Sequence, residues 1–337
     1  MLKITPLLLI LLFLSINISA QEYYDVEYIA RDTSQSKISA IAYWNKKESH
    51  TYRFTQKELK YNADTVSSEK IQNDYEMRFN VIDSTEKTYK IRWDFVRSLK
   101  KKDSKVEEQE NLIMSQLYDK YKDLQLIYTT DELGAMSEFE NLPKLTAMMD
   151  DIVNILKKPL FDTTKFESPK KRKQFEEYMS VFLNKDYILK KTFLEPITQF
   201  HNLMGFSCHL NDTLSFKMKA PNNLDGGLIV YDGYLFIESI DSTGEVQFIQ
   251  EMYPDEEQVN KMTFDFLNKT IGKGNKEMKD LEKTTMFGVD DYNRYFINLD
   301  KGLPTFVKTS RETYIKNRET NERTTQKQDI LIIELIE

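Results

Sequence analysis

Hydrophobic residues alternate with polar ones in two neighbouring segments, 75–82 and 89–95, and this period of two is typical of β-strands. The apolar members are Tyr75, Met77, Phe79 and Val81 in the first segment and Tyr89, Ile91, Trp93 and Phe95 in the second. Successive side chains of a strand point to opposite faces, so each segment has one apolar face and one charged face. The short polar link 83–87 predicts a hairpin turn. We therefore expect an antiparallel sheet with one face covered and the other in contact with water.

The tetrapeptide IDST occurs at 82–85 and again at 240–243, each time between two segments with strand periodicity. Four letters recur by chance about once in a chain of this length, so the shared context carries more weight than the letters. Asp83 and Asp241 are expected to head the two turns. After the second copy, Asp255 is a good N-cap for a helix, and a less regular helix is expected after the first copy, up to Tyr121. This pattern indicates an internal repeat of a unit made of a sheet and a helix.

Residues 141–205, between the two copies, have helical rather than strand periodicity. Three helices are expected here, starting at Pro143, Ser168 and about Asp186. The first has a broad apolar face, and the third is interrupted at Pro196. The stretch is too apolar to be a disordered linker, so we interpret it as a helical connector.

Strand periodicity returns at 214–220, and the chain ends in a predicted long hairpin of residues 305–316 with 324–336. Its last strand is apolar on both faces and is expected to be covered on both sides. The pattern as a whole predicts an α+β fold with two curved, half-barrel-like antiparallel sheets, each packed with helices. The expected segments are a signal peptide (1–20), an N-terminal β-rich unit (21–140), the helical connector (141–205) and a C-terminal β-rich unit (206–337).

The first 20 residues have the layout of a secretory signal peptide: the basic Lys3, an apolar run over 7–14, and a small-residue stop at Ala20. The apolar run is too short to span a bilayer comfortably. We expect cleavage after Ala20, and because Gln21 rather than a cysteine follows, the protein is not expected to be a lipoprotein. No second long apolar run follows, so the mature chain is expected to have no transmembrane segment and to lie in the periplasm or outside the cell.

The composition disfavours several classes of function. With 47 basic and 54 acidic residues the chain is mildly acidic, which disfavours nucleic-acid binding because phosphate contacts need clustered Lys and Arg. Cys208 is the only cysteine, so an internal disulfide is excluded and packing must hold the exported chain together. His50, His201 and His209 are scattered along the chain, and we predict no metal site and no cofactor.

Catalytic motifs are also weak. Residues 205–209, GFSCH, nearly match the G-x-S-x-G elbow of serine hydrolases, but His209 replaces the last glycine and the order runs from helix to strand. Cys208 and His209 are neighbours in an expected strand and point to opposite faces, so they cannot form a nucleophile–base pair. The pairs Asp232-Gly233 and Asp290-Asp291 are too sparse for calcium, and turns are their plainer explanation. We predict that the protein is not an enzyme.

The remaining signal is apolar and aromatic, with 20 Phe, 19 Tyr and 2 Trp. Candidate ligand-binding residues are Tyr75, Met77, Phe79, Tyr89, Ile91, Trp93, Phe216 and Phe248. Ordinary core is favoured for this stripe by roughly two to one. The functional alternative is a curved sheet that holds the face partly open as a cavity for an apolar ligand.

Three functions therefore stay open. We expect first a non-enzymatic binder or carrier of an apolar, lipid-like ligand in the cell envelope. The alternative is a structural or protein-interaction module of the envelope, for which charged strand residues such as Arg78 and Arg92 would form the contact surface. A carboxylate-dependent hydrolase is less favoured, because among 54 acidic residues a close pair carries no information.

Two stretches resemble a family of exported Gram-negative proteins of unknown function. They are YTTDELGAMSEFEN at 128–141, and APNNLDGG at 220–227 together with Gly302-Leu303-Pro304 and the hairpin after it. The layout is also similar to that of the half-barrel carriers of lipids and lipoproteins in the periplasm, in which a curved antiparallel sheet wraps helices. A shared layout does not fix function, and neither resemblance brings catalytic residues with it.

Overall fold

The computed structural model describes residues 22–30, 34, 36–62, 65–99, 117, 120–121, 124–160, 168–169, 172–173, 175–176, 185–221, 227–271 and 276–337. The expected signal peptide, most of the helix before Tyr121 and most of the helix from Ser168 lie outside these residues.

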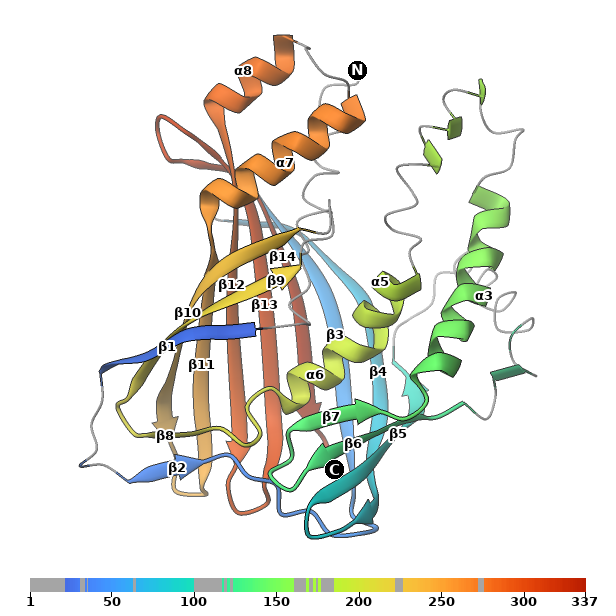
Figure 1. The fold of residues 1–337 in the computed structure, drawn as a ribbon, viewed down its shortest axis with the longest axis vertical. Coiled ribbons are helices and arrows are strands. Elements are labelled where there is room, and N and C mark those ends of the chain that lie inside the picture. Colours follow the sequence, from blue (N-terminus) through green and yellow to red (C-terminus); the bar gives the residue numbers. More distant parts are fainter. Residues whose placement is uncertain are drawn as a thin grey trace.

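The described chain is built on one large antiparallel sheet with helices on it (Figure 1). The strands of this sheet are β1 (Glu22–Ala30), β3 (Ser49–Asn62), β4 (Thr65–Ser84), β5 (Thr88–Ser98), β6 (Leu126–Asp131), β7 (Met136–Phe139), β9 (Thr213–Pro221), β10 (Leu228–Ile240), β11 (Glu245–Pro254), β12 (Thr285–Asn298), β13 (Leu303–Asn317) and β14 (Arg323–Leu335). Two short strands, β2 (Lys37–Ser39) and β8 (Ser207–His209), form a separate ribbon. The helices are α3 (Leu142–Leu160), α5 (Lys185–Leu189), the π-helical turn η2 (Lys190–Leu194), α6 (Glu195–His201), α7 (Glu256–Ile271) and α8 (Lys276–Thr284).

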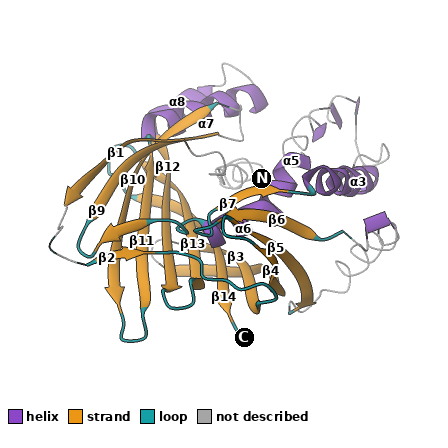
Figure 2. Ribbon diagram, turned by 60° about the horizontal axis from the view of Figure 1, so that its bottom comes forward, coloured by secondary structure: helices purple, strands orange, loops and turns teal. Residues whose placement is uncertain are grey.

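The strand order is β1-β9-β10-β11-β12-β13-β14-β3-β4-β5-β6-β7, and the edge strands β1 and β7 do not pair with each other. Figure 2 shows this sheet as a curved, open surface, with α6 lying against its concave face. The expected α+β character, with a large antiparallel sheet and packed helices, is confirmed.

The expectation of two separate sheets is not confirmed, because strands from both ends of the chain belong to one sheet. The last strand, β14, pairs with β13 on one side and with β3 on the other, from Gln326 opposite Tyr61 to Leu335 opposite Tyr52. As expected from its apolar run, β14 is buried on both faces, at Ile330 and Leu331. Because β14 is paired along both of its edges, it joins the strands of the two halves into one sheet.

The two IDST segments lie between paired strands as predicted, but their turns are built differently. The carboxylate of Asp241 accepts hydrogen bonds from the backbone N–H groups of Thr243 (2.8 Å) and Glu245 (3.0 Å). In the first copy the hydroxyl of Thr85 accepts from the N–H of Thr88 (3.0 Å), and Asp83 still belongs to β4. The prediction that Asp83 heads its turn was therefore wrong, because a threonine hydroxyl can make the same local hydrogen bond as an aspartate.

The helices follow the predicted signals. α3 spans the expected Pro143 helix and buries Leu145, Met149 and Val153. The interruption at Pro196 is a turn of π-helix, in which the N–H of Glu195 bonds the carbonyl of Lys190, five residues back. Proline has no N–H and crowds the carbonyl of the preceding turn, so the helix widens there before α6 continues.

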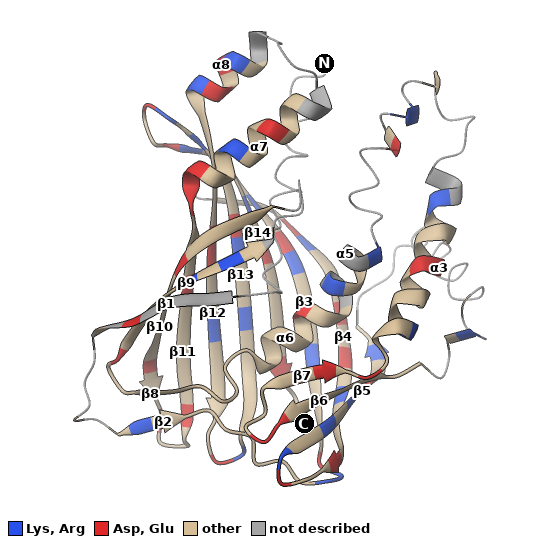
Figure 3. Cartoon of the chain, viewed as in Figure 1, with Lys and Arg blue, Asp and Glu red and all other residues tan. Residues whose placement is uncertain are grey.

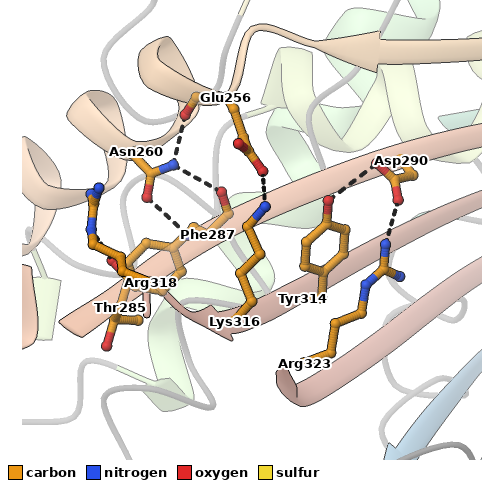
Figure 4. Close-up of polar contacts among 9 residues, drawn as sticks. All are labelled: Glu256, Asn260, Thr285, Phe287, Asp290, Tyr314, Lys316, Arg318 and Arg323. Atoms are coloured by element: carbon orange, nitrogen blue, oxygen red, sulfur yellow. Dashed lines mark hydrogen bonds and ion pairs between the residues drawn. The ribbon is translucent and has the colours of Figure 1, made fainter. Parts of the chain in front are cut away.

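α7 is capped as predicted and also closes an edge of the sheet. The carboxylate of Asp255 accepts the N–H of Gln258 (2.8 Å). Residues 285–290 of β12 extend beyond the end of β11, and on that side they have no strand partner among the described residues. There Asn260 accepts the N–H of Phe287 (2.9 Å) and donates to its carbonyl (3.1 Å), as a neighbouring strand would (Figure 4).

A second cluster in Figure 4 holds the convex face of β12 and β13 together. The ring of Tyr314 lies over Gly288, where an added Cβ would be 2.2 Å from ring atoms. The guanidinium of Arg323 stacks 3.7 Å from the centre of that ring and binds Asp290 at 2.9 Å. Only glycine fits beneath the tyrosine, so Gly288 has a packing role.

Candidate functional site

The eight candidate ligand-binding residues all lie on the concave face of the sheet or its packed core. Phe79, Ile91, Trp93, Phe216 and Phe248 are buried, whereas Tyr75, Met77 and Tyr89 are half-buried. The first group belongs to a filled core, and the second group is only partly covered. The ligand-binding role itself stays a prediction.

An aromatic cluster fills the middle of the concave face, and we call it the aromatic floor. Its members are Tyr52, Phe79, Trp93 and Phe200. Phe200 comes from α6 and lies edge-on to Tyr52 (5.0 Å between ring centres) and Trp93 (5.3 Å). Such edge-to-face pairs stabilise a core beyond the area they bury, so this part of the face is occupied by the protein itself.

A buried chain of hydrogen bonds runs beside the aromatic floor. Nδ1 of His201 lies 2.7 Å from the carbonyl oxygen of Gly134, and because a carbonyl can only accept, this nitrogen carries the proton. Nε2 of His201 then accepts from the hydroxyl of Tyr128 (2.6 Å), which in turn accepts from the indole N–H of Trp93 (2.9 Å). Burial lowers the pKa of His201 to about 4, so the imidazole is neutral at pH 7.

Charged side chains replace the apolar core farther along the same face, and we call this set the charged row. It comprises Asp291, Arg311, Asp329 and Glu58, which are consecutive cross-strand partners on β12, β13, β14 and β3, together with Lys327 and Lys60. Figure 3 shows both signs of charge along these middle strands. Buried ionic groups are rare in a fold unless they are paired, so their partners decide what the row can do.

Each cation of the charged row holds a carboxylate. Nε of Arg311 donates to Asp291 at 2.6 Å, and a second guanidinium nitrogen completes a two-point contact. Nζ of Lys327 lies 2.9 Å from Asp329 and 3.2 Å from Glu58. Burial alone would lower the pKa of Arg311, but the negative charge of Asp291 outweighs it and raises that pKa.

The hydroxyl of Tyr231 lies close to the charged row, near Arg311 and Asp291. Tyr231 is fully buried on β10, and its hydroxyl has no hydrogen-bond partner among the described residues. Burial raises the pKa of Tyr231, with Arg311 and Asp291 near enough to modify it. A buried hydroxyl without a partner is destabilising, which marks this position as a place where a ligand atom would be favourable.

A layer of amides separates the charged row from the aromatic floor. Asn293 on β12 donates to the side-chain oxygen of Gln250 (3.0 Å), which also accepts from Asn202 (3.2 Å). Asn202 donates to the hydroxyl of Tyr295 (2.8 Å), which donates to Gln199 on α6 (2.8 Å). The concave face therefore changes from aromatic to amide to ionic along the strands.

Sequence reasoning missed the charged row and misplaced part of it. Asp290-Asp291 and Asp232-Gly233, expected in turns, lie inside β12 and β10. The missed signal is the inward alternation of β12, in which Val289, Asp291 and Asn293 are all buried. In the sequence, a few polar residues within an alternating apolar pattern look like the end of a strand. In the structure the strand continues through them, and their side chains lie on the same face as the apolar ones.

A cleft between α7, α8 and the end of β13 is a second concave feature, with a volume of about 330 Å³. It is lined by Glu257, Asn260, Lys261, Phe264, Asp265, Asn268, Glu282, Met286 and Arg318. Its wall combines both charges with a small apolar base and favours no single ligand chemistry.

The cysteine, the acidic and histidine side chains, and two arginines were the other candidates for chemistry or contact. Cys208 is buried in β8, and burial raises its pKa to about 12, so the thiol is a poor nucleophile. Within the described part of the chain, no three His, Cys, Asp or Glu side chains gather as a metal site would require. Arg92 binds Asp94 at 2.8 Å, whereas Arg78 is exposed on β4.

No protein-family model matches the chain, and a search of curated proteins found no match. Among the helices the structure describes, none combines the length and apolar character needed to cross a membrane.

Proposed function

We propose that the protein is a non-enzymatic binder of an apolar, lipid-like ligand in the cell envelope, held against the concave face of the open sheet. The observation that carries the proposal is Phe95, which is 64% exposed although it lies on the same face as the buried floor. It pairs across the strands with Met77, and Met77 pairs with the buried Tyr52. An exposed aromatic residue beside a packed aromatic core is a typical ligand contact.

A continuous series of ring contacts joins the exposed Phe95 to the buried aromatic floor. Tyr75 is half-buried, stacks on Phe54 (5.4 Å, 4° between the planes) and lies 6.4 Å from Phe95. Phe54 in turn contacts Trp93 of the aromatic floor at 5.4 Å. We call Tyr75, Met77 and Phe95 the aromatic rim, and propose that the apolar part of the ligand lies along it.

Binding of an uncharged apolar fluorophore, N-phenyl-1-naphthylamine, to purified protein tests this proposal. Phe95→Asp should weaken binding about tenfold or more, because it places a charge where apolar contact is needed. Tyr43→Asp is the matched control: Tyr43 is 57% exposed but lies in the segment before β3, away from the aromatic rim.

Native mass spectrometry of protein from its own host should also detect a bound lipid. No fluorophore uptake and no bound mass, or equal losses in the two variants, would contradict the proposal.

A further inference from the structure

We infer that the charged row selects a ligand whose polar end is uncharged, such as a hydroxyl or an amide, over one that ends in a carboxylate or a phosphate. This inference rests on the proposed function, and concerns only the polar end of the ligand. It is carried by the ion pairs of the row and by the hydroxyl of Tyr231.

The cations of the charged row are already engaged. Arg311 makes a two-point contact with Asp291, and Lys327 binds Asp329 and Glu58. Lys60 lies 3.4 Å from the same Glu58. An incoming anion would compete for these cations with carboxylates already bound to them, of which Asp291 and Glu58 are buried and would lose part of their pairing.

The charge balance points the same way. The carboxylates are Glu58, Asp291, Asp329 and Glu195, which acts on Arg311 from the first turn of α6, and the cations are Lys60, Arg311 and Lys327. Four negative against three positive charges leave this group at −1. Adding the exposed Lys70, opposite Glu58 on β4, makes it neutral at most. Adding the negative charge of a ligand to a low-dielectric site that has no net positive charge is unfavourable.

The hydroxyl of Tyr231 supplies what an uncharged group needs. It can donate one hydrogen bond and accept others, and it has no partner among the described residues. Because this hydroxyl is buried, a ligand hydroxyl or amide would have to enter the core to reach it, but it would then satisfy the hydroxyl without disturbing an ion pair. A carboxylate could also accept a hydrogen bond from this hydroxyl. Its negative charge would then lie beside a group of side chains that has no net positive charge.

The spacing suits a ligand with a long apolar chain. Along the sheet, Arg311 and Tyr75 are separated by three strand spacings of about 4.8 Å and four residues of about 3.4 Å each, or about 20 Å in total. A polar end at the charged row would therefore let an extended acyl chain reach the aromatic rim. The class of ligand that fits is a long-chain alcohol, a monoacylglycerol or a fatty amide.

Competition against bound N-phenyl-1-naphthylamine at pH 7.5 tests the inference, with monopalmitoylglycerol and palmitate as matched competitors. Monopalmitoylglycerol should displace the fluorophore at about one tenth of the palmitate concentration or less. Tyr231→Phe should abolish most of this preference by weakening the competition of monopalmitoylglycerol more than that of palmitate. Tyr234→Phe, on the opposite face of β10, is the control and should keep the preference.

Each outcome decides a separate point. If palmitate competes as well as monopalmitoylglycerol, or if Tyr231→Phe keeps the preference, the inference is wrong while the proposed function stands. If the fluorophore does not bind at all, the proposed function fails and the inference fails with it. Folding of Tyr231→Phe is checked by its melting temperature, which should not fall, because the removed hydroxyl makes no hydrogen bond to a described residue.

Discussion

The aromatic floor and the charged row lie on one face of one sheet, yet they are stabilised in different ways. The aromatic floor is completed by Phe200 of α6, whose ring contacts Tyr52 and Trp93. The charged row consists of ion pairs such as Arg311–Asp291, whose attraction is offset by the free energy of removing both charges from water. We therefore expect the apolar part of this face to account for most of its stability. The ionic part is expected to add little net stability, and we propose that it selects the ligand instead.

The largest expected effect is in the aromatic floor. Phe200→Ala should lower the free energy of unfolding by about 4 kcal/mol, because Phe200 is 1% exposed and its removal leaves a cavity among packed rings. Phe95→Ala, at the 64% exposed position, should cost less than about 0.5 kcal/mol. Urea denaturation of both variants measures the difference. A loss below about 1 kcal/mol in Phe200→Ala would contradict the role given to the floor.

The charged row should behave differently when both partners are replaced. Arg311→Met alone should destabilise the fold by about 3 kcal/mol, since it leaves the buried Asp291 without its partner. The double variant Arg311→Met/Asp291→Leu should recover most of that loss, because two apolar groups of similar size need no ion pair. Urea denaturation of the single and double variants checks this. If the double variant is no more stable than the single one, the row is a major source of stability and the comparison fails.

The hydrogen-bonded chain at His201 should make the fold sensitive to acid. Folding lowers the pKa of His201 from 6.5 to about 4, so between these values the unfolded chain binds a proton that the folded chain does not. The free energy of unfolding should therefore fall as the pH drops from 6.5 to 4, by about 3 kcal/mol in total. Above pH 6.5 His201 makes no pH-dependent contribution.

The variant His201→Gln separates this effect from the titration of carboxylates in the same range. It should be less stable than the wild type at pH 7, yet its stability should change less between pH 6.5 and 4. His50→Gln is the control, because His50 is partly exposed and bound to Glu48 at the surface. Urea denaturation at four pH values measures both profiles, and parallel curves for the wild type and His201→Gln would rule His201 out as the cause.

The elements with a regular period were predictable from the sequence. The hairpins β4–β5, β10–β11 and β13–β14 and the helices α3 and α7 follow from alternation, from Asp255 as an N-cap and from Pro143 in the first turn. These signals are local, so neighbouring residues are enough to reveal them.

The rest depends on contacts between distant parts of the chain. β3 was not predicted, because only Tyr52 and Phe54 are apolar at its inward positions and the same face continues with Gln56 and Glu58. The single sheet results from the pairing of β3 with β14, near the two ends of the chain, and no local pattern specifies that pairing. The aromatic candidates on β4 and β5 were chosen from their period, and their ligand-binding role stays a prediction, whereas Phe95 was not among them and the charged row was missed because polar residues interrupt that period.

We propose that an apolar ligand lies along the aromatic rim of the concave face. Photolabelling with an apolar diazirine probe, followed by peptide mass spectrometry, tests this position most directly. We predict labels in the β4 and β5 peptides that carry Tyr75, Met77 and Phe95, and loss of those labels when monopalmitoylglycerol is added. Labels confined to the convex face, at Tyr234 and Tyr253, or to the cleft between α7 and α8 would contradict the account.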